Sequence, residues 1–282
     1  MNYRHAYHAG NHADVLKHIV LARVIEHMKK KDKPFRVIDA HAGIGIYDLK
    51  GIEAGKTGEW EGGVAKMAEP FLAEVEALIA PWREAIAKLN PHGGLAQYPG
   101  SPDLALSLMR EDDRLIANEL HPDDMTTLQR NIGWDERVKV TALDAEVCIK
   151  ANLPPPERRG VILIDPPYEV KNEAERVIRM IRHGLRRFAQ GVFMLWYPLK
   201  ADGLEKVLAA EVEAMGVPSS LRVKLRVREA FDAGGLAGSG LMILNAPWKL
   251  DEDLRVIVPA LATRLGLGES GHGTVEWVVP PK

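Results

Sequence analysis

Short apolar runs alternate with longer amphipathic segments along most of this chain. The runs are rich in Val, Ile and Leu, which predicts buried strands because β-branched side chains favour extended backbone. The predicted strands cover residues 35–39, 114–119, 138–142, 161–164, 192–196, 222–228, 241–244 and 274–279. Helices are predicted over residues 13–31, 101–110, 123–131 and 173–188. Strands that alternate with helices predict a mostly parallel, doubly wound α/β sheet.

Residues 50–97 interrupt this alternation. A glycine-rich stretch there is followed by sequence rich in Ala, Glu and Leu, which predicts a small helical insertion of two or three helices. Residues 1–49 and 98–282 would then form the core domain, with 50–97 as an insertion subdomain. Where the chain returns to the core, we expect Ser101 or Asp103 to cap the next helix.

One predicted strand ends in a sequence of unusual stiffness, Asp165-Pro166-Pro167-Tyr168. Proline fixes φ and holds the residue before it in extended geometry, so the Asp165 carboxylate is held rigidly at the end of the strand. The Pro166 carbonyl and the Tyr168 ring lie close by. Carboxylate and carbonyl oxygens accept hydrogen bonds and a flat ring stacks, a combination that suits a planar group carrying an NH2, such as a nucleobase amine. The alternative interpretation is a rigid turn without a chemical role.

Acidic residues follow three other predicted strands. Asp39 ends the first, Glu119 ends the second, and Asp144 lies just beyond the third. Ligands of such sheets bind beyond the carboxyl ends of the strands, so we expect these acids and Asp165 to converge on one crevice. The glycine loop after Asp39 lacks the third glycine of the dinucleotide fingerprint, which favours a ligand without a pyrophosphate.

Composition narrows the class of protein. With 282 residues, 46% of them hydrophobic, the chain can bury the core of one large domain. The single cysteine, Cys148, excludes an internal disulfide framework and a cysteine-based zinc cluster. The apolar runs are too short to span a bilayer and the first residues show no signal-peptide pattern, so we expect a soluble cytoplasmic protein.

Charge is distributed unevenly. The net charge is −2, yet residues 1–36 hold eight lysines and arginines against three acids, a local balance of +5. Such a patch fits a nucleic-acid enzyme, and it also fits an ordinary solvated surface.

The histidines near the start of the chain suggest a metal site at first sight: His5, His8, His12 and His18. Acid and cysteine ligands are not interleaved at metal spacing, so we favour substrate contact or helix packing and expect no metal.

Cationic residues alternate with apolar ones near the end of the chain, at Arg222, Lys224, Arg226 and Arg228. One face of this strand is therefore cationic. Either the charges protect an edge strand from aggregation, or they contact phosphate.

Several longer motifs stand together in this sequence: Tyr3-Arg4-His5, His8–His18, Asp39–Gly43, Tyr98–Pro102, Glu119–Pro122, Asp165–Glu169 and Leu195–Pro198. Together they resemble the bacterial RlmJ family, within the class I methyltransferases that use S-adenosylmethionine (AdoMet). Members methylate the exocyclic N6 amine of one adenine in 23S ribosomal RNA. The resemblance covers nearly the whole chain and is loosest in the insertion. Where the family usually has Asp-Gly, this chain has Asp144-Ala145.

The resemblance implies roles for individual residues. Glu119 would accept from the ribose hydroxyls of AdoMet and Asp144 from its adenine amine. The cofactor-binding set is Lys17, His18, His41, Ser101, Glu119, Asp144, Ala145 and Asp165. The catalytic set is Asp165, Pro166 and Tyr168, with Asp165 accepting the hydrogen bond and then the proton of the target amine and Tyr168 stacking on the base. Tyr3, Arg4 and His5 would contact the ribosomal RNA. Apart from the resemblance, we expect a monomer, although the sequence does not determine the oligomeric state.

Two other functions remain open at this point. A DNA adenine-N6 methyltransferase would share the tetrad, although the sequence shows no separate recognition domain. A catalytically silent RNA-binding protein on the same fold would not need the geometry of Asp165, so the intact acids favour the enzyme.

Overall fold

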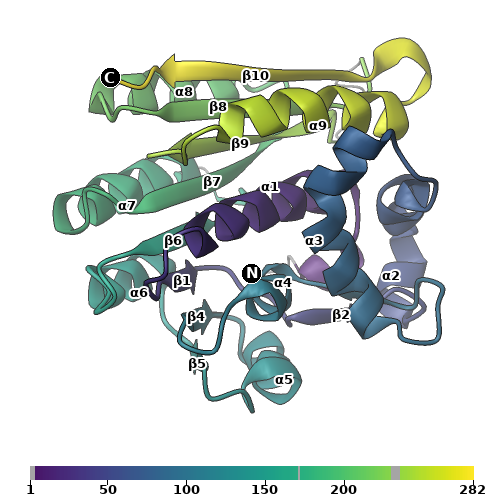
Figure 1. Cartoon of the computed structure of the whole chain (residues 1–282), viewed down its shortest axis with the longest axis horizontal. Helices are drawn as coiled ribbons and strands as arrows, with labels where there is room; N and C mark the ends of the chain where they lie inside the picture. Colours follow the sequence, from purple (N-terminus) through teal and green to yellow (C-terminus); the bar gives the residue numbers. More distant parts are fainter. Residues whose placement is uncertain (1–3, 171, 230–235) are drawn as a thin grey trace.

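The computed structural model describes residues 4–170, 172–229 and 236–282. At its centre lies an eight-stranded sheet (Figure 1). In chain order its strands are β1 (Arg36–Asp39), β4 (Arg114–Asn118), β5 (Val138–Thr141), β6 (Gly160–Ile164), β7 (Val192–Leu199), β8 (Ser220–Arg226), β9 (Gly238–Leu244) and β10 (His272–Val279). In space they follow the order β10-β8-β9-β7-β6-β1-β4-β5.

The sheet is parallel on one side and antiparallel on the other. Strands β5, β4, β1, β6 and β7 run parallel, whereas β9, β8 and β10 are added to β7 through antiparallel pairs. The predicted mostly parallel α/β sheet is therefore confirmed. The prediction that the cationic strand protects an edge is wrong, because β8 is paired on both sides and β10 takes the edge.

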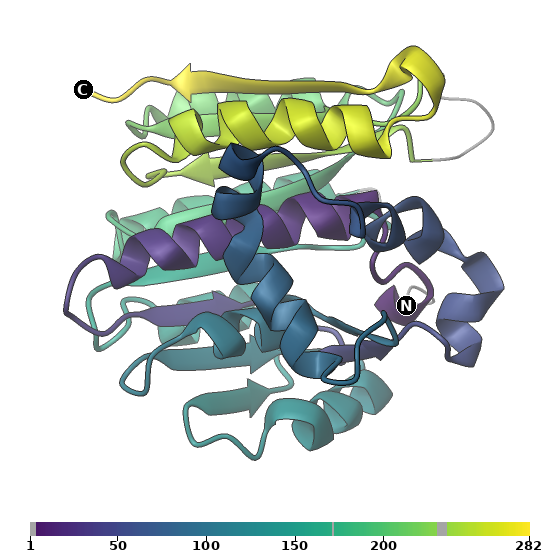
Figure 2. The same ribbon diagram turned by 45° about the vertical axis from the view of Figure 1, so that its right-hand side comes forward.

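Helices cover both faces of the sheet (Figures 1 and 2). One hydrophobic cluster joins the sheet to α1 (His12–Lys29), α3 (Ala73–Leu89), α4 (Ser101–Leu108), α5 (Pro122–Ile132) and α9 (Leu250–Leu265). A second cluster joins the opposite face to α6 (Ala145–Asn152), α7 (Glu173–Arg187) and α8 (Leu204–Met215). Within β1, Val37 belongs to the first cluster and Ile38 to the second, as the two-residue period of a strand requires. Helices α6, α8 and α9 are not among the predicted helices.

The expected helical insertion leaves and re-enters the core between two short strands. β2 (Ile46–Asp48) and β3 (Gln97–Pro99) pair antiparallel. Between them lie α2 (Ile52–Thr57), two short 3-10 helices at Glu59–Gly62 and Val64–Met67, and α3. α3 packs against α1 and α9, so it belongs to the main core, while α2 lies at the periphery. The division of the chain into a core domain and an insertion subdomain stays a prediction.

Helix α1 crosses the middle of the sheet and contacts β6 and β9 (Figure 1). It begins where the Asn11 side chain accepts hydrogen bonds from the backbone N–H groups of Ala13 and Asp14, which satisfies two donors of the first turn. The helix is buried on nearly all sides, and its buried residues include Asp14, Lys17 and His18. Buried charges need partners, so polar residues inside this helix indicate a functional site beside it.

Candidate active site

A cavity, called here the first cavity, opens beyond the carboxyl ends of β1, β4, β5 and β6. Three of the four strand-end acids line it, namely Glu119, Asp144 and Asp165. The other predicted cofactor residues also line it: Lys17, His18, His41, Ser101 and Ala145. Two further predicted site residues, Pro166 and His5, belong to the same lining. The convergence expected from a parallel sheet is therefore found for three of the four acids, and Asp39 is the exception.

Glu119 is held by backbone donors on both of its oxygens. Its Oε2 accepts from the N–H of Gly43 at 2.9 Å, and its Oε1 accepts from the N–H of His121 at 2.8 Å. Burial raises the pKa of Glu119. Gly43 has a φ of +61°, and a Cβ there would collide with the Tyr47 hydroxyl, so this turn favours glycine. Each carboxylate oxygen retains a lone pair for a ligand.

Asp39 lies behind the cavity wall and is 1% exposed. The Ser101 hydroxyl donates to its Oδ2 at 2.6 Å, and the N–H of His41 donates to its Oδ1 at 3.2 Å. Burial raises the pKa of Asp39 to about 6 against these two bonds. The prediction that Ser101 or Asp103 caps α4 is wrong: Gly100 stands at the cap without a side-chain bond, because the Ser101 hydroxyl is directed at Asp39.

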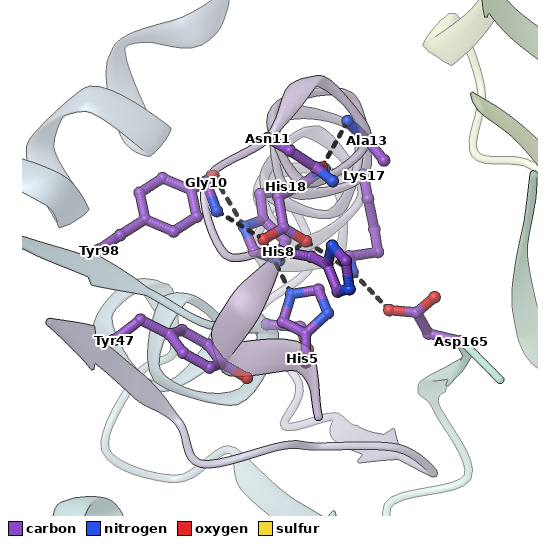
Figure 3. A network of polar contacts seen from close by, with 12 residues as sticks. His5, His8, Gly10, Asn11, Ala13, Lys17, His18, Tyr47, Tyr98 and Asp165 are labelled. Atoms are coloured by element: carbon purple, nitrogen blue, oxygen red, sulfur yellow. Dashed lines mark hydrogen bonds and ion pairs between the residues drawn. The ribbon is translucent and has the colours of Figure 1, made fainter. Parts of the chain in front are cut away.

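Lys17 lies between two carboxylates, those of Asp14 and of the catalytic candidate Asp165. Figure 3 shows Lys17 beside Asp165. Its ammonium pairs with Asp165 and lies 2.9 Å from Asp14 Oδ1. Burial alone would lower the pKa of Lys17, but the two carboxylates raise it well above its usual value. Asp14 also bonds the His5 ring and the N–H of Gly10, each at 2.9 Å. Sequence reasoning missed Asp14, although its position one helical turn before Lys17 could have suggested the pair.

Two histidines of the first cavity are neutral. Burial lowers the pKa of His18 to about 3 and that of His41 to about 4. His18 Nδ1 lies 3.0 Å from the Tyr98 hydroxyl, which links α1 to β3. His41 Nδ1 accepts from the backbone N–H of Asp165 at 3.2 Å. Hydrogen bonds with the Tyr98 hydroxyl and the Asp165 backbone therefore position the two neutral rings.

The other N-terminal histidines, His8 and His12, differ in their surroundings. His8 pairs with Glu59 at 2.9 Å, whereas burial lowers the pKa of His12 to about 4. Within the described ranges, no group of three or more His, Cys, Asp or Glu residues is arranged to hold a metal ion.

Asp144 stands at the start of α6 with both oxygens engaged. Its Oδ1 accepts from the N–H of Glu146 at 2.9 Å, which caps the helix. Its Oδ2 lies 2.8 Å from Nη2 of Arg176, a cavity-lining residue that the sequence did not single out. Ala145 is the first residue of α6, where a backbone N–H has no acceptor within the helix.

A second cavity adjoins the first, and His5, Lys17, Asp165 and Pro167 line both. Its further lining includes His12, Trp196, Lys200 and Arg228. Asp165 therefore lies at the junction of two cavities, where it can face a ligand on either side.

Some predicted site residues lie elsewhere. Tyr168 lines neither cavity; its hydroxyl donates to the Trp196 carbonyl at 3.0 Å, and the two rings lie 6.0 Å apart. Arg4 is paired with Asp124 at 2.8 Å rather than lining a cavity. Tyr3 lies outside the described residues.

The cations of the alternating strand are partly neutralised. Arg222 pairs with Glu276, and Lys224 lies 3.2 Å from Glu205. Arg228, just beyond β8, lines the second cavity instead. Of the residues named here, Arg228 is the one positioned to meet a ligand there.

Acids at the carboxyl ends of a parallel sheet, with Asp165-Pro166-Pro167-Tyr168 closing β6, are typical of class I methyltransferases. A family model described as "Ribosomal RNA large subunit methyltransferase D, RlmJ" matches residues 32–279. The chain belongs to this family and is a methyltransferase.

Individual relatives agree with the family match. The protein named Ribosomal RNA large subunit methyltransferase J from Escherichia coli strain K12 is 42% identical over 99% of both chains. Its namesake from Haemophilus influenzae is 40% identical over the same share. A crystal structure of protein LPL1258 from Legionella pneumophila strain Philadelphia 1 superposes with a TM-score of 0.85 at 32% identity, covering 95% of this chain and 98% of that one. Among the described residues, no helix is long and apolar enough to cross a bilayer.

Proposed function

We propose that this protein transfers a methyl group from AdoMet to the N6 amine of an adenine in 23S ribosomal RNA. The observation that carries the proposal is the position of Asp165. It lies where the two cavities meet, and the ammonium of Lys17 holds its carboxylate in place. The names of the relatives support ribosomal RNA as the substrate.

The first cavity has a donor set that fits AdoMet. Glu119 has both oxygens fixed by backbone donors and keeps lone pairs that two ribose hydroxyls could use. Asp144 and the N–H of Ala145 together offer an acceptor and a donor, as the edge of an adenine requires. His18, His41 and Ser101 match family positions near the methionine end of the cofactor, where they would offer neutral polar groups. The glycine loop needs no room for a pyrophosphate.

The second cavity suits the target nucleotide. Trp196 offers a ring on which a base can stack, and Lys200 and Arg228 offer cations for phosphate. The base must leave its stack to enter. His5 also lines this cavity, and the family resemblance implies that Tyr3, Arg4 and His5 contact the RNA.

The chemistry asked of this chain is modest. An adenine amine is a poor nucleophile because its lone pair is spread into the ring. Hydrogen bonds from the amine to the Asp165 carboxylate and the Pro166 carbonyl would localise that lone pair, and Asp165 would take the proton as the methyl arrives. Bound AdoMet supplies an electrophilic methyl group. Lys17 holds Asp165 in one orientation, so position contributes much of the rate.

Incubation of the purified protein with AdoMet and a 23S rRNA transcript tests the proposal. Mass spectrometry of the digested RNA should show N6-methyladenosine. Asp165→Ala should lower the rate by ~10²–10⁴ while the fold survives, because Lys17 keeps its pair with Asp14. A wild-type protein that forms no N6-methyladenosine, or a mutant near the wild-type rate, would contradict it. Duplex DNA in a parallel reaction tests the DNA alternative, and AdoMet calorimetry tests the silent binder.

We also propose that the protein acts as a monomer in the cytoplasm, with residues 50–97 as a helical insertion whose helix α3 packs on the main core. Light scattering of the purified protein measures its molar mass and therefore tests whether it is a monomer.

A further inference from the structure

One face of α7 forms a wall of the first cavity. Glu173, Arg176 and Met180 all line it, and their spacing of three and four residues places them on one side of the helix. α7 follows almost directly after the Asp165 tetrad, so this wall and the catalytic candidate belong to neighbouring segments of the chain. The resemblance assigned no role to these three residues.

Arg176 is the charged group of this wall. Its Nη2 lies 2.8 Å from Asp144 Oδ2, and its Nη1 lies 3.6 Å from Glu173 Oε1. The guanidinium therefore lies between two carboxylates, at the end of the cavity where α6 begins. The Arg176 and Asp144 side chains are 37% and 40% exposed, and ion pairs this exposed contribute little to folding. The position of Arg176 in the cavity wall therefore favours a role in ligand binding over a role in folding.

We propose that Arg176 is a cofactor-binding residue that holds the adenine moiety of AdoMet together with Asp144. This inference rests on the proposed function, because it takes the first cavity as the AdoMet site. A carboxylate offers about four lone-pair positions, so Asp144 can keep its bonds to Arg176 and to the Glu146 N–H and still accept from an adenine amine. The planar guanidinium adds a cation that packs on aromatic faces.

The same helix provides a matched control. Arg179 lies one turn further along α7 and pairs with Glu146 at 3.2 Å, with its side chain 48% exposed. It therefore resembles Arg176 in charge, helix and partner type, but it does not line the first cavity. Replacing it removes a similar ion pair between α6 and α7 without touching the proposed site.

Isothermal titration calorimetry measures the ligand affinity of three variants, Arg176→Ala, Arg176→Lys and Arg179→Ala. The ligands are AdoMet and 5′-methylthioadenosine, which keeps the adenosine and lacks the methionine carboxylate and amine. Arg176→Ala should weaken both ligands about fivefold to tenfold, the range of a partly desolvated cation–ring contact. Arg176→Lys keeps the charge but loses the planar fork, so it should lose part of that affinity. Arg179→Ala should bind both ligands within about twofold of wild type.

The outcomes separate this inference from the proposed function. Equal affinities in Arg176→Ala and Arg179→Ala overturn the role of Arg176 while AdoMet binding stands. Tighter binding by Arg176→Ala overturns it as well, since the guanidinium would then obstruct the site. Loss of AdoMet affinity with unchanged methylthioadenosine affinity would move Arg176 away from the adenine. A wild-type protein that binds neither ligand overturns the proposed function itself. If Arg176→Ala fails to fold, the comparison of Arg176→Lys with Arg179→Ala decides.

Discussion

Lys17 offers the sharpest test of the network beneath the site. Its ammonium lies between Asp14 and Asp165, and the residue is 3% exposed while Asp14 is 0% exposed. Lys17→Met keeps most of the side-chain volume and removes the charge. Two carboxylates would then face each other without their shared cation, one of them fully buried.

The expected loss of unfolding free energy in Lys17→Met depends on the partners that Asp14 keeps. Breaking a buried ion pair on one side costs about 3–5 kcal/mol. Asp14 keeps its bonds to His5 and to the Gly10 N–H, so we expect the lower end, about 3 kcal/mol. A chain of 282 residues has an unfolding entropy near 0.6 kcal/mol per kelvin at roughly 2.1 cal/mol/K per residue, which makes this about 5 °C in Tm.

Thermal and urea unfolding followed by circular dichroism measures this loss. Lys29→Met is the matched control on the same helix, because Lys29 pairs with Glu26 at 2.6 Å while both side chains are more than a quarter exposed. That variant should stay within about 0.5 kcal/mol of wild type. The double variant Asp14→Asn/Lys17→Met should recover most of the stability, since the fully buried carboxylate is gone and Asp165 has a partly exposed side chain, while methyl transfer stays low. A Lys17→Met protein as stable as Lys29→Met, or a double variant no better than Lys17→Met, would refute the reasoning.

The remaining predictions concern three residues. Burial raises the pKa of Asp39 from 3.8 to about 6, so the folded state binds the carboxyl proton more tightly than the unfolded state does. Protonated Asp39 therefore stabilises the fold fully below pH 4, and this stabilisation is lost as pH rises through 6. Wild type should therefore lose up to about 3 kcal/mol relative to Asp39→Asn between pH 4 and 7, and parallel Tm values across that range check it. Glu119→Ala should weaken AdoMet by about 2–3 kcal/mol in a titration, and unchanged affinity would remove Glu119 from the cofactor site. Tyr3→Ala should lower methylation by the ~1–3 kcal/mol of one stacking contact while AdoMet affinity and Tm stay near wild type; full activity would make the segment a tail.

Much of the fold could be predicted because strands and their ends are local features. The run from Val161 to Ile164 is apolar enough to be buried on both faces, and it is a strand of the observed sheet. The prolines after Asp165 restrain its backbone locally, while the distant Lys17 pairs with its carboxylate. Parallel strands then bring Glu119 and Asp144 to the same edge by topology alone.

Other features depended on neighbours that the local pattern does not contain. The cationic alternation of Arg222 and Lys224 looked like an edge strand, but whether a strand lies at an edge depends on where β10 pairs. Ser101 had the side chain of a helix cap, but a buried acceptor 62 residues earlier took its hydroxyl.

By itself, then, the sequence determined which segments form the strands of the large sheet and where the acids stand along them, because both follow from backbone sterics and side-chain periodicity within a few residues. Only the tertiary structure decided which groups meet. Lys17 and Asp165 lie 148 residues apart and pair because α1 crosses the end of β6, and Arg176 reaches Asp144 because α7 packs beside α6. Such contacts are set by the packing of two hydrophobic clusters on opposite faces of the sheet, and no local pattern encodes the distance between two helices.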